Sequence, residues 1–514
     1  MRMWMRVAIA GAILEMSVAV VGCRDEPGGV TQPGTTDTGV VDTGTTTTGT
    51  TTTGADESSG DPVDAIVERL ARDCEDPSEQ IYTTAPPEAW SPDMRGAIAG
   101  CAYDRRILVE EMTAHYAEYE EFPDPGLSTS VHAITLSYWT ERQPDEPVLT
   151  SATVYVPDEL RADPAPLLVL GHGSVGIADS CAPSRDDDNG FDKDWKALVY
   201  QFAGDGWIVI MPDFPGLGTE GPGTWMLSTD EGHAILDATR AARRLFEDGT
   251  LNDLNALIGQ SNGGHATLSA QAMLDDYGAE GQVVANVLYS PYWLSNAAWG
   301  ALVSPVGDAL LNSVFMSMTL QYFYGHAYAY EGSQAALDLM LPDKAQDVAE
   351  LLESECWGDV TGEELGPPSL GIMLGEDVFT EEVVDEVGTC AVLEQCESAL
   401  AQAWRERWVA DRPTPSPDVP IVYWLGGVDD FLPPGFQQCG IERLVANDAD
   451  LTLCVDAEGG HAEVAPRTAA WVRQYLESVL LGGAAPEPCP GVDTLGMELS
   501  CTLPIVNSTD PADP

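Results

Sequence analysis

The stretch Asn255-Ala256-Leu257-Ile258-Gly259-Gln260-Ser261-Asn262-Gly263-Gly264-His265 decides what the rest of the chain is expected to be. A short apolar run ends in Gly-x-Ser-x-Gly, and small residues at helical spacing follow at once. Strand, sharp turn and helix form the setting in which this motif presents a nucleophilic serine. The two flanking glycines are needed for steric reasons, because the strained turn leaves no room for a Cβ beside it. Ser261 is therefore the first candidate catalytic residue.

Apolar runs on both sides of this stretch alternate with amphipathic segments. Besides the run at 255–258, we expect strands at 131–139, 148–156, 166–170, 207–211, 283–288, 421–425 and 451–455. Helical spacing predicts helices at 62–74, 97–120, 229–247, 434–447 and 462–480. Strands that are apolar throughout and alternate with helices are typical of a parallel sheet covered on both faces. The sequence therefore predicts a doubly wound α/β fold.

Changes in composition divide the chain into six segments. Strand signals stop over residues 292–416, which are rich in aromatic, Met and Ala residues and predict a helical cap. This cap would be inserted between the sixth and seventh strands of the core, above the carboxyl edge of the sheet. The predicted segments are a signal at 1–23, a Thr/Gly-rich tether at 24–60, core at 61–291, cap at 292–416, core at 417–483 and a Pro-rich acidic tail at 484–514.

The first segment has the features of an export signal. Arg2 and Arg6 precede an apolar stretch that closes with Val20-Val21-Gly22-Cys23. This ending resembles the bacterial lipobox, which implies that Cys23 is lipidated, although Glu15 departs from the pattern. A plain secretory signal or an uncleaved anchor is the alternative. We expect an exported protein of the cell envelope, anchored to the outer membrane by its N-terminal lipid and facing the periplasm or the exterior.

Charge and cysteine content exclude some ligands and predict disulfide bonds. The chain has 83 acidic and 23 basic residues, for a formal net charge of −60. Nucleic acid is excluded as a partner because its binding needs clustered Lys and Arg. No Cys-x-x-Cys pair is present to suggest a zinc ribbon. Setting Cys23 aside, the other cysteines are an even number, and we expect disulfides Cys74–Cys101, Cys181–Cys356, Cys390–Cys396, Cys439–Cys454 and Cys489–Cys501, although sequence cannot fix the connectivity.

A serine nucleophile needs a base and an orienting acid. In α/β-hydrolases these follow the serine in the order acid then histidine, each at the carboxyl end of a strand. Of the seven histidines, only His461 lies beyond the strand at 421–425. The turn Gly426–Pro433 supplies Asp429 as the acid, with Asp430 as the alternative. His172 and His265 are interpreted as a loop-holding side chain and a helix-face or pocket-wall side chain.

The tetrahedral oxyanion needs two backbone donors. The residue after the nucleophile is Asn262, and Ser174 in the loop after the strand at 166–170 is the expected second. Residues 171–176 and 216–221 both match Gly-x-Gly-x-x-Gly, but neither is followed by a helix that would hold a pyrophosphate. We therefore expect no organic cofactor and no metal.

The chain from Val148 to Leu480 resembles the α/β-hydrolase superfamily. Within it, residues 172–184, the turn 212–218 and the helix 236–242 resemble the bacterial and fungal secretory-lipase group. The resemblance implies serine-dependent ester hydrolysis, with the cap helping to select acyl chains. Asn262 stands where such enzymes often have another small polar residue, but only its backbone N–H is required.

These observations predict an exported serine esterase or lipase that acts on acylglycerols or similar lipophilic esters. We expect a monomer that binds a small-molecule or lipid ester and touches the membrane only through its lipid anchor. Two alternatives stay open: a serine exopeptidase of the same fold, and a catalytically dead, surface-tethered binding protein.

Overall fold

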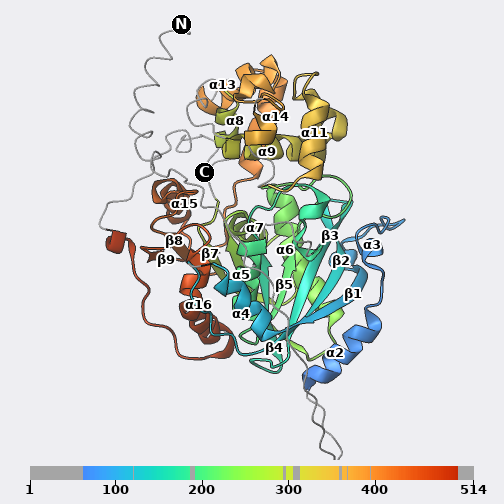
Figure 1. Cartoon of the computed structure of the whole chain (residues 1–514), viewed down its shortest axis with the longest axis vertical. Coiled ribbons are helices and arrows are strands. Elements are labelled where there is room, and N and C mark those ends of the chain that lie inside the picture. The colour runs from blue at the N-terminus through green and yellow to red at the C-terminus, as the bar shows by residue number, and fades with distance from the viewer. Residues whose placement is uncertain are drawn as a thin grey trace, which may run out of the picture. The chain divides into compact units, whose positions relative to one another are not determined.

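The computed structural model describes residues 62–119, 121–185, 192–292, 297–304, 313–357, 362–366, 368–393 and 395–495. Within these ranges nine strands form one sheet in the order β1-β2-β3-β5-β4-β6-β7-β8-β9 (Figure 1). The strands are β1 (Ile98–Ile107), β2 (Val131–Gln143), β3 (Glu146–Pro157), β4 (Ala165–Gly171), β5 (Ile208–Pro212), β6 (Leu251–Gln260), β7 (Gln282–Tyr289), β8 (Ile421–Gly426) and β9 (Leu451–Asp456). From β1 to β5 neighbours pair antiparallel, and from β5 to β9 they pair parallel. The predicted, mostly parallel α/β sheet is confirmed.

Helices cover both faces of this sheet. One face packs against α4 (Val109–Ala117), α5 (Asp192–Ala203) and α16 (Val464–Leu481). The other packs against α2 (Pro62–Asp73), α6 (Ser228–Leu245), α7 (Asn262–Ala272) and α15 (Pro434–Ala446). Every residue of β4 is consequently buried, because successive side chains of a strand point to opposite faces. With both faces covered, the loops at the carboxyl ends of the strands are where a ligand can approach.

The predicted elements are confirmed to within a few residues, except at 97–120. One helix was expected there, whereas Ile98–Ile107 form β1 and only Val109–Ala117 is helical. The cause is long-range, because β1 pairs with β2 over its whole length and the Cys74–Cys101 disulfide holds it in place. Helix propensity is a weak local preference that such pairing overrides.

The segment between β7 and β8, residues 292–416, is termed the insertion. Its described helices are α8 (Ala297–Leu302), α9 (Ser313–Glu331), α10 (Ser333–Asp338), α11 (Ala345–Ser354), α12 (Gly362–Leu365), the π-helix η6 (Val383–Val387), α13 (Gly388–Leu393) and α14 (Ala399–Ala410). Figure 1 shows these helices grouped at one end of the sheet. They share an apolar cluster with Ile177, Trp225, Tyr292 and Leu432, which follow β4, β5, β7 and β8. The insertion thus packs on the loops at the carboxyl edge.

Three predicted disulfides are confirmed and two are wrong. The confirmed pairs are Cys74–Cys101, Cys181–Cys356 and Cys390–Cys396. Cys454 bonds Cys489, which overturns both Cys439–Cys454 and Cys489–Cys501.

The correction follows from the alternation of side chains along β8 and β9. Cys439 lies on α15, which packs against the face that carries Tyr423 and Leu425. Cys454 points to the opposite face, toward α16. The chain after α16 then passes beside β9, where Val455 N donates to Pro490 O at 2.8 Å, so Cys489 lies within reach.

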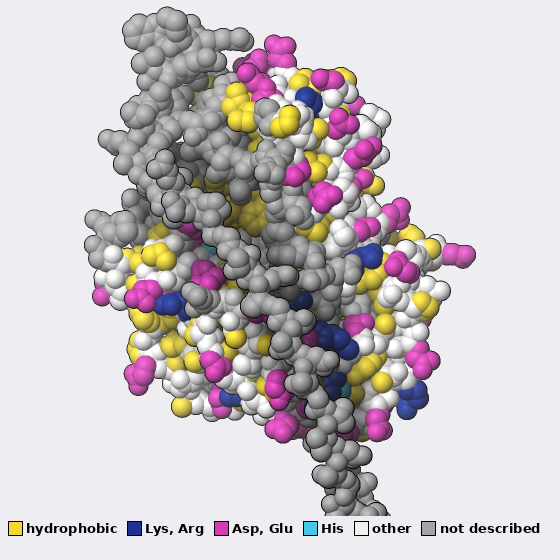
Figure 2. All heavy atoms as spheres, in the orientation of Figure 1, with side chains coloured by type: hydrophobic (Ala, Val, Ile, Leu, Met, Phe, Trp, Pro, Cys, Tyr) yellow, Lys and Arg dark blue, Asp and Glu magenta, His cyan; other side chains and the backbone are white. Residues whose placement is uncertain are grey.

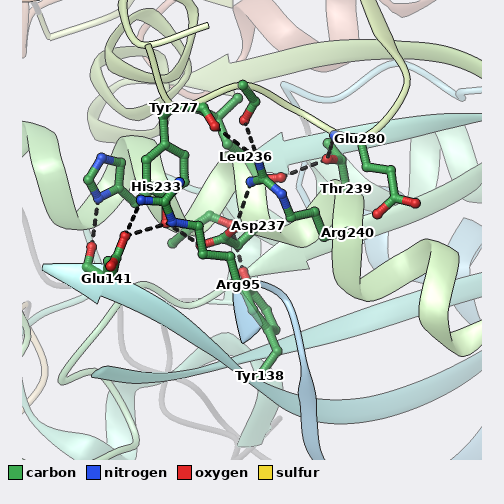
Figure 3. A network of polar contacts seen from close by, with 12 residues as sticks. Arg95, Tyr138, Glu141, His233, Leu236, Asp237, Thr239, Arg240, Tyr277 and Glu280 are labelled. Atoms are coloured by element: carbon green, nitrogen blue, oxygen red, sulfur yellow. Dashed lines mark hydrogen bonds and ion pairs between the residues drawn. The ribbon is translucent and has the colours of Figure 1, made fainter. Parts of the chain in front are cut away.

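A buried polar network fixes α6 against the sheet (Figure 3). Asp237 accepts hydrogen bonds from Arg240 Nη1 at 2.6 Å and from the Tyr277 hydroxyl at 2.7 Å. The Arg95 guanidinium lies 3.9 Å from the centre of the Tyr277 ring and donates to Glu141 Oε2 at 2.6 Å. The network joins α6 to β2 and to the chain after α7.

Acidic side chains are spread over the face visible in Figure 2, with few Lys or Arg among them. Within the described ranges, no helix is long and apolar enough to cross a membrane. The same part of the chain holds no group of three or more His, Cys, Asp or Glu arranged to bind a metal ion. The predicted signal with Cys23, the tether and residues 496–514 lie outside the described residues.

Candidate active site

Ser261 forms the turn between β6 and α7, with φ 52° and ψ −118°. A positive φ is strained for a residue with a Cβ, at a cost of about 1–3 kcal/mol. Two backbone hydrogen bonds hold the turn: Ser261 N to Tyr289 O at 3.0 Å, and Tyr292 N to Ser261 O at 2.9 Å. This strained strand-to-helix turn is the geometry of a nucleophile elbow.

The glycines around Ser261 allow the backbone segments to approach closely. A Cβ on Gly259 would lie 2.2 Å from Gly263 O, and one on Gly263 would lie 1.9 Å from Gly171 O. Any side chain at either position would therefore push α7 away from β6 or from β4. The contact also brings the loop after β4 to the serine, because a Cβ on Gly173 would lie 3.8 Å from Ser261 Cβ.

Asp429 and His461 come from the ends of β8 and β9. His461 Nδ1 donates to Asp429 Oδ2 at 2.8 Å. Asp429 is buried, and its Oδ1 accepts from the backbone N–H groups of Phe431 at 3.0 Å and Leu432 at 2.7 Å. The alternative acid, Asp430, is exposed. In the structure Asp429 therefore contacts His461, whereas Asp430 faces the solvent.

His461 is also tied to the elbow. Gln260, the residue before Ser261, donates from Nε2 to His461 O at 3.2 Å. Because Nδ1 donates to a carboxylate, the neutral ring carries its proton there and leaves Nε2 free to accept one. Burial works to lower the pKa of His461, but the charge of Asp429 and its hydrogen bond outweigh burial and raise the pKa above 6.5.

We expect this raised pKa to set the acid limb of the pH profile. An imidazolium cannot accept the serine proton, so activity is lost as pH falls through the raised pKa of His461. The acid limb of kcat/KM for a soluble short-chain ester should therefore have its midpoint above pH 6.5, the ordinary value for histidine. A midpoint at or below that value would contradict the prediction.

The two predicted oxyanion donors line one small cavity. Ser174 and Asn262 border a space of about 20 Å³ next to Gly173, which is room for a single water-sized group. Ser174 is partly exposed, and its hydroxyl accepts a hydrogen bond from Trp225 Nε1 at 2.9 Å. His172 lies beneath this loop, with Nδ1 2.6 Å from Gly173 O.

Sequence reasoning missed two aromatic residues of this site. Trp225 follows β5 and reaches Ser174, and Phe431 packs on His461 with ring centres 4.9 Å apart. The position of Phe431, two residues after Asp429 in the same turn, was a usable signal. No local signal identifies Trp225, which lies 51 residues from Ser174 in sequence.

Comparison with known proteins identifies the family of the chain. The model of the secretory lipase family matches residues 194–463, which is just over half of the chain and includes Ser261, Asp429 and His461. The chain belongs to the secretory lipase family. Membership of this family, together with the disulfides, indicates an exported protein.

Solved structures share the fold of this chain. The rice cell wall degrading esterase LipA from Xanthomonas oryzae superposes with a TM-score of 0.59 at 18% identity, covering 76% of this chain and 100% of that one. Candida antarctica lipase A gives a TM-score of 0.55 at 16% identity, covering 80% of this chain and 89% of that one. These similarities confirm the α/β-hydrolase fold.

A curated relative matches part of the chain. Lipase A of Moesziomyces aphidis is 27% identical over 169 residues. The match covers 31% of this chain and 35% of that protein. The chain therefore spans about a third of the length of this relative.

Proposed function

We propose that this protein is a serine esterase or lipase that hydrolyses lipophilic carboxylic esters through Ser261, His461 and Asp429. The observation that carries the proposal is the 2.8 Å hydrogen bond from His461 to the buried Asp429. It occurs beside a serine in the strained elbow geometry, at the carboxyl ends of three strands of one sheet. A serine, a histidine and an acid in this arrangement perform acyl transfer on many folds.

In the proposed mechanism His461 Nε2 takes the proton of Ser261 as its hydroxyl attacks the ester carbonyl. Asp429 holds the ring in the tautomer that leaves Nε2 unprotonated, and stabilises the imidazolium that forms. The backbone N–H groups of Asn262 and Ser174 bind the oxyanion of the tetrahedral intermediate. His461 then protonates the leaving alcohol, and water releases the acid from the acyl-enzyme by the same steps in reverse order.

Partly exposed aromatic rings next to His461 support a lipophilic substrate. Phe431 packs on His461, on Trp357 at 5.4 Å and on Phe315 at 6.5 Å between ring centres. Phe315 and Trp357 belong to the insertion, which we therefore propose acts as a cap over the site. The Cys181–Cys356 disulfide and the hydrogen bond from Trp357 N to Val175 O, at 3.0 Å, fix this part of the cap to the loop after β4.

We expect Trp357→Ala to discriminate between acyl-chain lengths. An apolar wall contributes about 1–3 kcal/mol for each methylene group that it buries. The substitution should lower kcat/KM for an octanoate or longer p-nitrophenyl ester by about 10- to 100-fold, and for the acetate by less than about 3-fold. The measurement is the chain-length series on both proteins.

Trp471→Ala is the matched control for this prediction. Trp471 packs on Trp424 and Tyr475 rather than on His461, so its removal should leave the chain-length profile unchanged. Equal losses for acetate and octanoate in Trp357→Ala would show that the indole does not line the acyl site.

Assay of the wild-type protein on p-nitrophenyl esters and on aminoacyl anilides tests the proposed function. Ester turnover with no anilide turnover supports an esterase. Preferential cleavage of the anilides would instead identify a serine exopeptidase. Turnover of neither, together with no labelling by a fluorophosphonate, would leave a binding protein.

We also propose that the mature protein begins at a lipidated Cys23 and is held at the outer membrane through residues 24–60. The support is the lipobox-like sequence before Cys23 and the tether composition. Intact-mass analysis of membrane-extracted protein tests the anchor, and an unacylated Cys23 would overturn it. We propose that the protein is a monomer, and its mass by light scattering after delipidation tests that.

A further inference from the structure

Glu231 is a fully buried carboxylate that the proposed mechanism does not use. It lies in the first turn of α6 and is 0% exposed. One oxygen accepts from the backbone N–H of Met226 at 2.9 Å. The other lies 2.7 Å from Nδ1 of His265, which is on α7 one turn after Ser261. Glu231 therefore joins the chain after β5 to the helix that begins at the nucleophile.

His265 and Glu231 form a buried hydrogen-bonded pair. His265 Nδ1 donates to the Glu231 carboxylate, and Nε2 lies 3.1 Å from the backbone oxygen of Asp411 and 3.3 Å from the Ser228 hydroxyl. Burial works to lower the pKa of His265, but Glu231 and Asp411 raise it overall. The pair resists displacement, because separating it would leave a buried carboxylate without its partner.

The pair of Glu231 and His265 fixes the turn that carries Trp225. Met226, whose N–H binds Glu231, has a φ of 62°, a conformation that a residue with a Cβ adopts only under constraint. From the other side, His326 Nε2 donates to Trp225 O at 3.0 Å. The indole packs on Trp299, with ring centres 5.1 Å apart, and its Nε1 donates to Ser174 Oγ at 2.9 Å. Trp225 is thus held at its backbone and its ring while its N–H reaches the loop after β4.

We propose that Trp225 is a positioning residue for the oxyanion hole, which holds Ser174 at a fixed place relative to Asn262. This inference rests on the proposed function, because it assumes that Ser174 and Asn262 supply the donors. The same small cavity is bordered by Ser174, Trp225, Glu231 and Asn262. Glu231 contacts α7 and the turn of Trp225, and Trp225 in turn contacts Ser174, so these contacts connect the two predicted donors. An oxyanion donor contributes only where its N–H points at the developing charge, and losing one lowers kcat by about 100- to 1,000-fold. Fixing Ser174 protects that alignment.

The test removes one hydrogen bond and keeps the ring. Trp225→Phe should lower kcat by about 10- to 100-fold with KM changed by less than about 3-fold, because the donor acts on the transition state more than on the bound ester. Ser174→Ala, which removes the acceptor and keeps the backbone N–H, should have the same effect. The double variant should be no slower than either single variant, because both remove the same interaction.

Trp404→Phe is the matched control. Its indole lies in the same apolar cluster but packs on Phe323 and Tyr322, and among the described residues Trp404 Nε1 has no hydrogen-bond partner, so kcat should stay at the wild-type value. A trifluoromethyl ketone, whose adduct carries the oxyanion, should bind Trp225→Phe more weakly by the same factor as kcat/KM falls.

Four outcomes would overturn the proposal: an unchanged kcat in Trp225→Phe, an equal loss in Trp404→Phe, multiplying losses in the double variant, or unchanged binding of the ketone. Each of these requires a wild-type protein that a fluorophosphonate labels at Ser261. A wild-type protein that is not labelled would instead overturn the proposed function, and this inference with it.

Discussion

Replacing Ser261 with alanine is expected to lower ester hydrolysis by about 10⁴- to 10⁶-fold, because residues of such a triad act as one unit and removing the nucleophile removes the covalent route. The same change should abolish labelling by a fluorophosphonate, which reacts with an activated serine. The strained turn at φ 52° is imposed by the glycines around it, so alanine leaves the fold intact. Steady-state rates and gel labelling of both proteins provide the measurement.

Ser228 provides a control for this experiment, because it also lies next to a histidine. Ser228 Oγ lies 3.3 Å from His265 Nε2, whose Nδ1 lies 2.7 Å from Glu231. These residues mimic a serine, histidine and glutamate triad, but none is more than 1% exposed, so no substrate can reach them. Labelling should therefore persist in Ser228→Ala. Labelling that survives in Ser261→Ala and disappears in Ser228→Ala would place the nucleophile elsewhere.

Asp429→Asn is expected to lower kcat by about 10³- to 10⁴-fold with little change in KM. The reason is the tautomer of His461: an amide in place of Asp429 can donate to Nδ1, which moves the ring proton to Nε2 and blocks the base. The buried carboxylate also accepts two backbone N–H groups. The amide oxygen can keep those bonds, so the turn should survive. Kinetics on a soluble ester, with circular dichroism to confirm folding, provide the measurement.

Asp430→Asn is the matched control for this change. It also replaces an aspartate carboxylate with an amide, but one residue further along the chain and on a side chain exposed to solvent. Its kcat should remain within about 2-fold of wild type, because an exposed charge contributes little to its surroundings. A large loss in Asp430→Asn with a small one in Asp429→Asn would reverse the assignment of the acid.

Much of the fold was predictable because its signals are local. Strands such as β4 and β7 are apolar runs of strand length bounded by turns, and their burial on both faces requires that pattern. The edge strand β1 lacks the signal. Its residues are mostly partly exposed or exposed, so the apolar periodicity is weak, and only its pairing with β2 identifies it as a strand.

The candidate site divides in a similar way. The elbow is local, because Gly259 and Gly263 must lack side chains for the turn to close at all. The order of serine, acid and histidine along the chain then selected His461 by position. Local sequence did not decide which aspartate is the acid, since Asp429 and Asp430 both fit the turn. In the structure, the backbone hydrogen bonds of that turn hold Asp429 in the interior, whereas Asp430 is exposed.

By itself, the sequence determined the α/β class, the nucleophile elbow at Ser261 and the position of the insertion. Each depends on periodicity, on glycine sterics or on the order of elements, which can be read along the chain. Only the tertiary structure decided that Cys454 bonds Cys489, that Asp429 faces His461 and that Trp225 reaches Ser174. Those contacts join residues distant in sequence, and they depend on which face of the sheet each side chain points to and on how the loops pack above it.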